Sequence, residues 1–435
     1  MDLMTIGLIG IAITLILLIL KTPVGVCLGI GGFFGLMGIY GWNFGMAASQ
    51  VGSAPFFTAF SFELSVIPLF ILMGHFALYA GVGEEAYIAA YKLVGRVPGG
   101  LYIGTLVACA LFGTSCGASL AVAAIFTKIC LPEMLRYGYN KSLACGTICA
   151  GGCLGMLIPP STLAVVYGLI CEQSIGKLFI GGIGPGIMYT ILFSLGTGAV
   201  CIFRPELAPR ADIQVSLREK LLVIRHIWKV LLLGGIVLGG IYSGIFNPTE
   251  AGAVGALAAF IMYVAKRFSW ASLKESLLEA SSVTCMIFLI FIGATIFSRM
   301  LGLSGISPLI LKTVSGLEVS PIWIFSGFLL LYILMGMLLD SISMLCITMP
   351  IVLPLTMAWG FDPTWTGLMI IIAMEVGLLT PPMGLNVYVV KGAAGDVVSL
   401  EEVFKGALLF VPLFFVGMAI LVVEPQIITW LPGLM

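Results

Sequence analysis

The stretch Gly155-Met156-Leu157-Ile158-Pro159-Pro160-Ser161 interrupts an apolar segment that is long enough to cross a bilayer, and Gly377-Leu378-Leu379-Thr380-Pro381-Pro382-Met383 interrupts a second one. Proline has no backbone N–H and clashes with the preceding helical turn, so each segment is predicted to unwind at its middle. Within the hydrocarbon core, unwound backbone is tolerated only where protein buries it or where it lines a water-filled cavity. Two such breaks at matching places in two halves of a chain indicate the binding site of a membrane transport protein.

The composition of the 435-residue chain is that of a multi-pass membrane protein, because 60% of its residues are hydrophobic and only 9% are charged. A soluble domain has about 25% charged residues. Apolar segments of membrane-spanning length predict an all-α polytopic fold. The formal net charge is zero, so the chain lacks the excess of basic residues that is typical of nucleic-acid-binding proteins. Leu3–Leu20 lacks a basic flank and a small-residue cleavage site, so it is interpreted as the first membrane helix.

The sequence shows no pattern of catalytic residues: it has no paired catalytic carboxylates, no Ser-His arrangement, no zinc motif and no Walker A loop. The eleven cysteines form no metal-binding set with histidines, and we interpret them as small packing residues at helix contacts. An enzyme, a channel and direct ATP-driven transport are therefore disfavoured, and no organic cofactor is expected.

The two broken helices belong to a repeat, because a shift of 222 residues places one half of the chain on the other without a gap. The matched positions are Ser119 with Ser341, Leu131-Pro132 with Leu353-Pro354, Tyr137-Gly138-Tyr139-Asn140 with Trp359-Gly360-Phe361-Asp362, Gly155 with Gly377, and Pro159-Pro160 with Pro381-Pro382. Apolar sequence produces chance matches of Leu and Ile easily, whereas matched prolines and glycines are harder to obtain by chance. The sequence therefore predicts two structurally related halves.

In each half, two apolar arms precede the broken helix and are predicted to form a re-entrant hairpin. The arm Leu101–Phe112 reaches about 18 Å at 1.5 Å per residue, short of the hydrocarbon core of about 30 Å. The predicted elements are the hairpin 99–136 with arms Leu101–Phe112 and Leu120–Leu135 joined by residues 113–119, the broken helix 141–171, the hairpin 320–358 with arms Ile322–Leu339 and Met344–Ala358 around residues 340–343, and the broken helix 364–391.

The remaining apolar segments predict full spans and give the domain organisation. These spans are Leu3–Leu20, Val24–Tyr40, Ala54–Gly81, Lys177–Phe203, Val230–Ser243, Thr249–Ala265, Ser281–Leu301 and Lys405–Val423, with amphipathic stretches near Leu217–Trp228 and Lys266–Glu279. The predicted regions are scaffold helices at 1–53, a first transport region at 54–203, a connector with scaffold helices and an amphipathic arm at 204–280, a second transport region at 281–423, and a C-terminal tail at 424–435.

Charge predicts the orientation in the membrane. The connector 204–229 holds six Lys or Arg residues against three Asp or Glu residues, so the positive-inside rule places it in the cytoplasm. Counting spans from there, the first hairpin enters from the cytoplasm, the second enters from the opposite face, and both termini are periplasmic. The halves are thus predicted to form an inverted repeat, each with about five spans and one hairpin.

The hairpin tips and helix breaks are predicted to meet near the midplane, where they offer hydroxyl and carbonyl oxygens. Such oxygens at helix C-terminal ends suit Na⁺, and helix N-termini suit a carboxylate. At least two Na⁺ sites are expected: Ser115 and Ser119 with Gly155 and Pro159, and Asp340, Ser341 and Ser343 with Gly377 and Thr380. The candidate substrate-binding residues are Ser115, Ser119, Ser161, Ser341, Met383 and Asn386. Alternatively, the small tip residues only allow close helix packing.

The isolated ionisable residues each allow two interpretations. Asp340 either serves the cation or the closure of the tip, or caps the second arm of its hairpin. Glu375 either holds unwound backbone or acts indirectly on an ion. Glu63 and Glu250 lie near span ends, where caps or interfacial anchors are expected, with transport chemistry as the alternative. His75 is expected to be a helix-contact residue, with a proton relay as the alternative.

With these features in place, the chain resembles the large membrane subunit of the tripartite ATP-independent periplasmic (TRAP) transporters, the DctM-like family. The matching stretches cover nearly the whole chain: Ile67-Pro68-Leu69-Phe70-Ile71-Leu72-Met73-Gly74, Arg96-Val97-Pro98-Gly99-Gly100-Leu101, Gly138-Tyr139, Leu157-Ile158-Pro159-Pro160-Ser161, Asn247-Pro248-Thr249-Glu250-Ala251 and Glu375-Val376-Gly377-Leu378-Leu379-Thr380-Pro381-Pro382-Met383-Gly384-Leu385-Asn386. At the first tip, Cys116-Gly117 departs from the more usual run of Ser, Ala and Val.

The resemblance implies a secondary transporter of the bacterial inner membrane that is driven by a Na⁺ gradient through an elevator motion. It implies two partners, a small four-helix membrane subunit and a soluble periplasmic protein that captures an organic acid. Arms near 83–100 and 305–317 would link scaffold and transport regions. The alternative is a stand-alone carboxylate/Na⁺ symporter or an ion antiporter with the same inverted hairpins.

Overall fold

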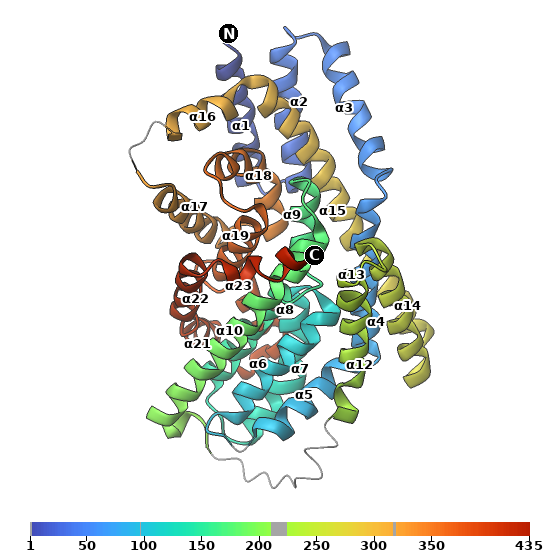
Figure 1. The fold of residues 1–435 in the computed structure, drawn as a ribbon, viewed down its shortest axis with the longest axis vertical. Coiled ribbons are helices and arrows are strands. Elements are labelled where there is room, and N and C mark those ends of the chain that lie inside the picture. The colour runs from blue at the N-terminus through green and yellow to red at the C-terminus, as the bar shows by residue number, and fades with distance from the viewer. Residues whose placement is uncertain (1, 96, 210–223, 316–318) are drawn as a thin grey trace.

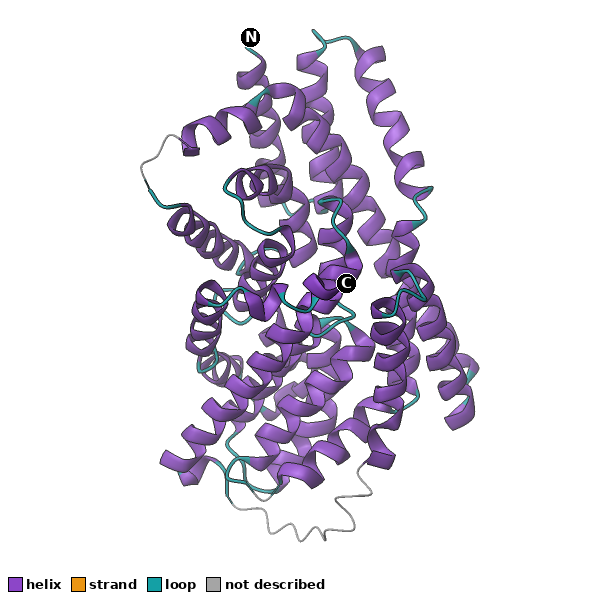
Figure 2. Ribbon diagram, viewed as in Figure 1, coloured by secondary structure: helices purple, strands orange, loops and turns teal. Residues whose placement is uncertain are grey.

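The computed structural model describes residues 2–95, 97–209, 224–315 and 319–435, and every regular element in these residues is helical (Figures 1 and 2). Five of the described helices are long and apolar enough to cross a membrane, or seven spans if two bent helix pairs are each counted as one. Several shorter apolar helices lie among them. The chain is therefore an all-helical, multi-pass membrane protein.

An outer group of helices includes a long one, α15, which contacts the first four helices of the chain. Its members are α1 (Leu3–Ile19), α2 (Val24–Ile39), α3 (Phe44–Ala59), α4 (Val66–Tyr79), α12 (Ile224–Gly234) with the π turn Gly235–Gly239 and α13 (Gly240–Tyr242), α14 (Pro248–Arg267) and α15 (Trp270–Ser304). Helices α2 and α15 touch backbone to backbone, because a Cβ atom added to Gly293 would lie 2.1 Å from the Gly25 carbonyl oxygen. Helix α4 packs against α14, α15 and α6.

Two helical hairpins occupy opposite halves of the view in Figure 1, with α6 (Gly100–Cys116) and α7 (Ser119–Arg136) in the lower half and α17 (Pro321–Gly336) and α18 (Ser341–Ala358) in the upper half. The predicted first tip, residues 113–119, is wrong in extent, since the helix continues to Cys116 and only Gly117 and Ala118 link the arms. Gly113 lies within the helix, where its lack of a side chain allows close packing against the Cα atom of Gly155, and Gly117 ends the helix with a left-handed φ of +63°.

Both predicted breaks are present. Helices α8 (Lys141–Leu157) and α9 (Thr162–Ile170) form a pair bent by 43° around Pro159-Pro160, and α19 (Pro363–Gly377) and α20 (Leu385–Ala394) flank Pro381-Pro382. The structure repeats local details at the predicted spacing of 222 residues. Asn140 and Asp362 cap α8 and α19 by accepting from the N–H three residues on, and Gly138 and Gly360 have left-handed φ values of +75° and +77°.

Three predicted boundaries are wrong. The span predicted at Ala54–Gly81 begins at Phe44 and bends by 55° before the 3-10 turn Glu63–Ser65, so the predicted boundary after residue 53 falls within α3. The amphipathic stretch Lys266–Glu279 is not separate, because α15 continues without interruption for 35 residues. The final span begins at Leu400 with α21 (Leu400–Leu408), which α22 (Val411–Val423) continues. Most of the predicted amphipathic helix near Leu217–Trp228 lies outside the described residues.

The connecting helices complete the chain. They are α5 (Val82–Val94), α10 (Ile175–Phe203), α16 (Ile306–Ser315) and α23 (Gln426–Thr429), with 3-10 turns at Pro205–Leu207, Gly395–Val397 and Pro432–Leu434. The predicted tail 424–435 is thus partly helical, and it packs on α10, where Gly184 faces the Ile427 carbonyl oxygen. The halves interlock, because α20 packs on α7 of the first hairpin and α9 packs on α18 of the second.

Candidate functional site

A cavity of about 480 Å³ lies where both hairpin tips face α4 and α15. Its wall takes Cys116, Ala118 and Ser119 from the first tip and Asp340 and Ser341 from the second. The breaks contribute neighbouring side chains, and the outer helices close the other side. These further lining residues include Met156, Thr162, Leu163, Leu378 and Leu385 from the broken helices, Gly74 and His75 from α4, and Glu279, Ser282 and Met286 from α15.

The first tip is docked on the first break. The Gly117 carbonyl oxygen accepts hydrogen bonds from the Thr162 N–H at 3.1 Å and from the Thr162 hydroxyl at 3.0 Å. A Cβ atom added to Gly117 would lie 2.2 Å from the Pro160 carbonyl oxygen, so only glycine fits here. Ser161 caps α9 by accepting from the Ala164 N–H at 3.3 Å. Thr162 is not among the site residues predicted from the sequence. Its position directly after the Pro-Pro-Ser break does, however, indicate the first residue of a new helix.

The serines predicted for the first cation site are both buried, but they face different neighbours. Ser119 donates to Glu375 Oε1 at 3.4 Å, so it contacts α19 of the other half as well as the cavity. The Ser115 hydroxyl has no hydrogen-bond partner among the described residues. Gly155 packs tightly between the arms of the first hairpin, against Gly113 and Val122, and Pro159 is buried beside it in the break.

The second tip is built around Asp340, which caps α18. Asp340 Oδ2 accepts from the Ser343 N–H at 3.0 Å, and Oδ1 accepts from the Ser343 hydroxyl. The capping interpretation is therefore confirmed, while the same carboxylate also lines the cavity beside Ser341. Ser341 begins α18 just as Ser119, its counterpart in the repeat, begins α7.

The other residues predicted near the second break spread over distinct environments. The Thr380 hydroxyl donates to the Val376 carbonyl oxygen at 2.6 Å, and Gly377 packs against Gly336 much as Gly155 packs against Gly113. Asn386 is fully buried and donates from Nδ2 to Cys153 Sγ at 3.2 Å. Met383 is 47% exposed, and it is absent from the cavity wall.

Among the residues that the structure describes, the cavity wall takes the carboxylates of Asp340 and Glu279 but no Lys or Arg. An anion held here would therefore have to be balanced by bound cations and by helix N-termini, each of which carries about half a positive charge. The N-termini of α7 and α18 provide such ends, since Ser119 and Ser341 both line the cavity. The site thus combines acceptor oxygens for a cation with two helix ends that suit a carboxylate.

His75 and Glu279 form a polar pair in the opposite wall, where His75 Nδ1 lies 3.2 Å from Glu279 Oε2. The expectation that His75 is a helix-contact residue accounts for only part of its surroundings, because it also faces the cavity. No local pattern in the sequence joins these two residues, which lie on α4 and α15. Glu250 acts as the predicted cap through a capping box with Asn247, and Glu63 begins the 3-10 turn before α4.

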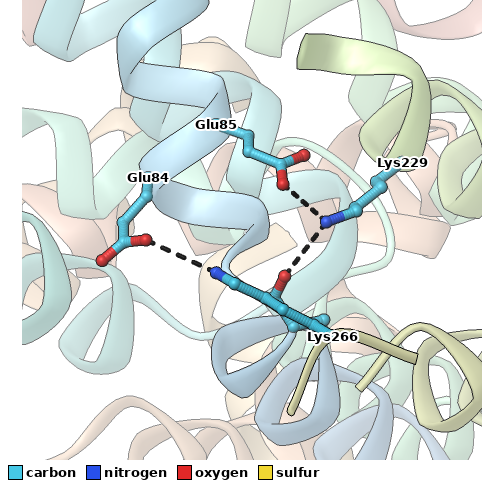
Figure 3. A network of polar contacts seen from close by, with 5 residues as sticks. Glu84, Glu85, Lys229 and Lys266 are labelled. Carbon is cyan, nitrogen blue, oxygen red and sulfur yellow. Dashed lines mark hydrogen bonds and ion pairs between the residues drawn. The ribbon is translucent and has the colours of Figure 1, made fainter. Parts of the chain in front are cut away.

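A network of ion pairs ties α5 to the outer helices (Figure 3). Lys229 of α12 lies 2.6 Å from Glu85 Oε1 and donates to the Ala80 carbonyl oxygen at 3.2 Å. Lys266 of α14 lies 3.5 Å from Glu84 Oε2. The Lys229 and Glu85 side chains are 12% and 24% exposed, whereas those of Lys266 and Glu84 are 41% and 64% exposed. The first pair should therefore contribute more to stability than the second.

We expect Lys229→Ala to lower the free energy of unfolding by about 1 to 3 kcal/mol, because Glu85 and the Ala80 carbonyl oxygen lose a charged donor in a partly buried place. Lys266→Ala is the matched control and should cost less than about 1 kcal/mol. Thermal unfolding of the purified protein in detergent measures both. Equal shifts of the unfolding temperature in the two variants would show that burial does not determine how much each ion pair contributes to stability.

The described residues hold no group of three or more His, Cys, Asp or Glu that could bind a transition metal. The fold is similar to that of the Alcanivorax borkumensis YdaH transporter, with a TM-score of 0.56 at 16% sequence identity over 82% of this chain and 85% of that chain. This likeness is one of fold, and it defines the class as a multi-pass, all-helical membrane protein whose cavity is bordered by broken helices and hairpin tips.

The chain belongs to the family described as Tripartite ATP-independent periplasmic transporter, DctM component, which residues 11–427 match. It is 31% identical to the C4-dicarboxylate TRAP transporter large permease protein DctM of Vibrio cholerae over 96% of each chain. It is 35% identical to the protein of the same name from Pseudomonas aeruginosa over 87% of this chain and 88% of that one. The family is one of transporter permeases, so the protein is not an enzyme, and the resemblance found in the sequence is confirmed.

Proposed function

We propose that this protein imports an organic carboxylate across the bacterial inner membrane, driven by a Na⁺ gradient. The observation that carries the proposal is the cavity that the N-termini of α7 and α18 both border, with Ser119 and Ser341 in equivalent positions of the repeat. Both relatives are named for C4-dicarboxylates. A substrate with two carboxylates fits two helix ends, one for each charged group.

The coupling ion fits the donor set of the tips, because Na⁺ prefers hydroxyl, carbonyl and carboxylate oxygens and needs no sulfur or imidazole. Ser115 supports a first site, since its buried hydroxyl oxygen lacks a partner in the described chain. We assign Ser115, Ser119, Gly155 and Pro159 to the first Na⁺ and Asp340, Ser341, Ser343, Gly377 and Thr380 to the second. Bound Na⁺ would offset the carboxylates of the wall before an anionic substrate enters.

We assign the alternating access to an inverted repeat that moves as an elevator. The repeated caps at Asn140 and Asp362, the interlocked packing of α20 on α7 and of α9 on α18, and the opposite placement of the hairpins in Figure 1 support this assignment. In this scheme the hairpins and broken helices move together, α5 and α16 act as linking arms, and both termini face the periplasm.

The proposed partners follow from the family, whose description names a tripartite transporter of which this chain matches one component. We assign the other two components to a small four-helix membrane subunit and a periplasmic substrate-binding protein. The periplasmic protein would select the organic acid and deliver it to the cavity. The lipid bilayer would surround the protein that forms the transport path, and nucleic acid would have no role.

The test is uptake of radiolabelled organic acids into proteoliposomes, with C4-dicarboxylates, sialic acid, sugar acids and keto acids as the panel. We expect uptake only with an inward Na⁺ gradient and only when both partners are present. Uptake by this chain alone would instead establish a stand-alone symporter or antiporter. Uptake that is indifferent to Na⁺ would contradict the proposed coupling.

A further inference from the structure

The cavity extends beyond the hairpin tips, because its wall follows three helices for some distance. On α4 and α15 the lining residues recur at the three- and four-residue spacing of one helix face. At 1.5 Å per residue the wall covers about 10 to 12 Å of each helix. The lining residues run from Ile71 to Leu78 on α4, from Ala118 to Ile125 at the start of α7 and from Glu279 to Ile287 on α15.

The three parts of the wall lead toward the same end of the molecule. His75 lies 3.2 Å from Glu279, which places the C-terminal part of α4 beside the N-terminal part of α15. A Cβ atom added to Gly83, at the start of α5, would lie 3.7 Å from Ile125 Cγ2. The cavity therefore lengthens from the tips toward Arg136, where the first hairpin ends. This is the side that the proposed orientation places in the cytoplasm.

Lys128 lies on α7 just beyond the cavity wall. Ala121, Ile125 and Lys128 are spaced at i, i+4 and i+7, so they share one face of the helix. Ala121 and Ile125 line the cavity and are partly buried, whereas Lys128 is exposed. Lys128 thus stands one helical turn past Ile125, at the mouth of the cavity.

The Lys128 ammonium group has no counter-ion within the residues that the structure describes. The acidic residues of α5, which packs on α7, are already paired, Glu84 with Lys266 and Glu85 with Lys229. A charged group on a helix at membrane depth is unfavourable unless it has a partner or lies in water. Lys128 is therefore expected to face water and to be available for an anion.

We propose that Lys128 binds a carboxylate of the substrate at the mouth of the cavity, as the anion passes between the hairpin tips and the cytoplasm. The inference rests on the proposed import of an organic carboxylate. Asp340 and Glu279 make the described wall negative, so they repel an anion that leaves the tips. A positive charge just beyond them lowers this electrostatic barrier and attracts the anion toward the exit.

The test compares an anionic and a cationic methanethiosulfonate reagent at a cysteine beside Lys128. Ile125→Cys places this thiol one turn away, in a chain that also carries Cys285→Ser and Cys116→Ser to remove the exposed native thiol and the one in the cavity wall. Both reagents are added to inside-out membrane vesicles, without substrate or a Na⁺ gradient. Lys128→Gln should lower the ratio of anionic to cationic reaction rates by about threefold to tenfold, and high salt should shrink this change.

Lys274→Gln is the matched control for the loss of positive charge. Lys274 is also exposed, but it lies on α15 five residues before Glu279, about 140° around the helix from it and so away from the cavity face. Lys274→Gln should leave the ratio unchanged, and Lys128→Arg should preserve it because arginine keeps the charge. An equal change in Lys274→Gln would overturn the proposal, since general surface charge would then set the ratio. If Ile125→Cys does not fold, Ala121→Cys takes its place.

Transport provides the second readout, with the organic acid of the panel above that the wild type takes up fastest. Lys128→Gln should slow uptake several-fold, Lys128→Arg should restore it, and the Na⁺ concentration for half-maximal uptake should stay unchanged in both. The proposal is overturned if Ile125→Cys does not react from the cytoplasmic side, if Lys128→Gln leaves the reagent ratio unchanged, or if that variant transports like the wild type. The thiol reaction needs no substrate, so its outcome is independent of whether the protein imports carboxylates.

Discussion

Gly117→Ala is expected to abolish Na⁺-dependent uptake while the protein still accumulates in the membrane. The added Cβ atom would lie 2.2 Å from the Pro160 carbonyl oxygen, so the first tip must move away from the first break. The two hydrogen bonds from Thr162 to the Gly117 carbonyl oxygen would then be lost. At about 1 kcal/mol for each bond, the equilibrium constant for docking the tip falls roughly 30-fold from the lost hydrogen bonds alone. The steric clash of the added Cβ atom lowers it further, so we expect uptake to be lost.

Gly360→Ala is the matched control for this prediction. Gly360 has a similar left-handed backbone, with φ of +77° against +63° at Gly117, but an added Cβ atom there would meet nothing within 4 Å. Alanine should cost about 1 to 2 kcal/mol of backbone strain at either position. Uptake per folded molecule should therefore stay near wild type in Gly360→Ala. Equal loss of uptake in both variants would show that strain, and not the docking of the tip, explains the effect.

Asp340→Asn is expected to raise the Na⁺ concentration needed for half-maximal uptake by about 10- to 100-fold, as expected for loss of about 1.5 to 3 kcal/mol of charge-assisted bonding. Asparagine can still cap α18 by accepting from the Ser343 N–H, so the helix should persist. The substitution thus removes the charge at the cavity and keeps the cap. Uptake measured against Na⁺ concentration in proteoliposomes gives the result.

Asp362→Asn is the matched control, because it also removes the charge of a capping carboxylate but does so outside the cavity. Asp362 caps α19 by accepting from the Trp365 N–H at 2.9 Å, and it does not line the cavity. Its Na⁺ response should match that of the wild type. Ser341→Ala should weaken the response in the same direction as Asp340→Asn, since both residues line the cavity at the second tip. If Asp340→Asn and Ser341→Ala both respond to Na⁺ like the wild type, the second cation site is misplaced.

Much of the fold could be predicted from sequence because its decisive features are local. A Pro pair removes backbone donors wherever it occurs, so both breaks were visible at Pro159-Pro160 and Pro381-Pro382. Asn140 and Asp362 likewise cap the helices that they precede. The predicted first tip, residues 113–119, is too long because Gly113 belongs to the helix. At this position glycine permits close contact with Gly155, and a tertiary contact of this kind leaves no local signal in the sequence.

The sequence could predict only those residues of the candidate site that belong to the hairpin tips. Ser119, Asp340 and Ser341 line the cavity, and their position at helix starts explains why the sequence indicated them. The contact between Ser119 and Glu375 and that between His75 and Glu279 join residues far apart in the chain. No hydrophobic period or cap signals such a pairing, because it depends on how the halves interlock.

The central claim is that the two hairpins enter the membrane from opposite faces, and labelling of single cysteines tests it most directly. Arg136 and Ala358 end α7 and α18, are equivalent in the repeat and are exposed. Of the native cysteines only Cys285 is exposed, so Cys285→Ser provides the background. A membrane-impermeant maleimide should label Arg136→Cys only from the cytoplasmic side and Ala358→Cys only from the periplasmic side. Labelling of both positions from the same face would contradict the account.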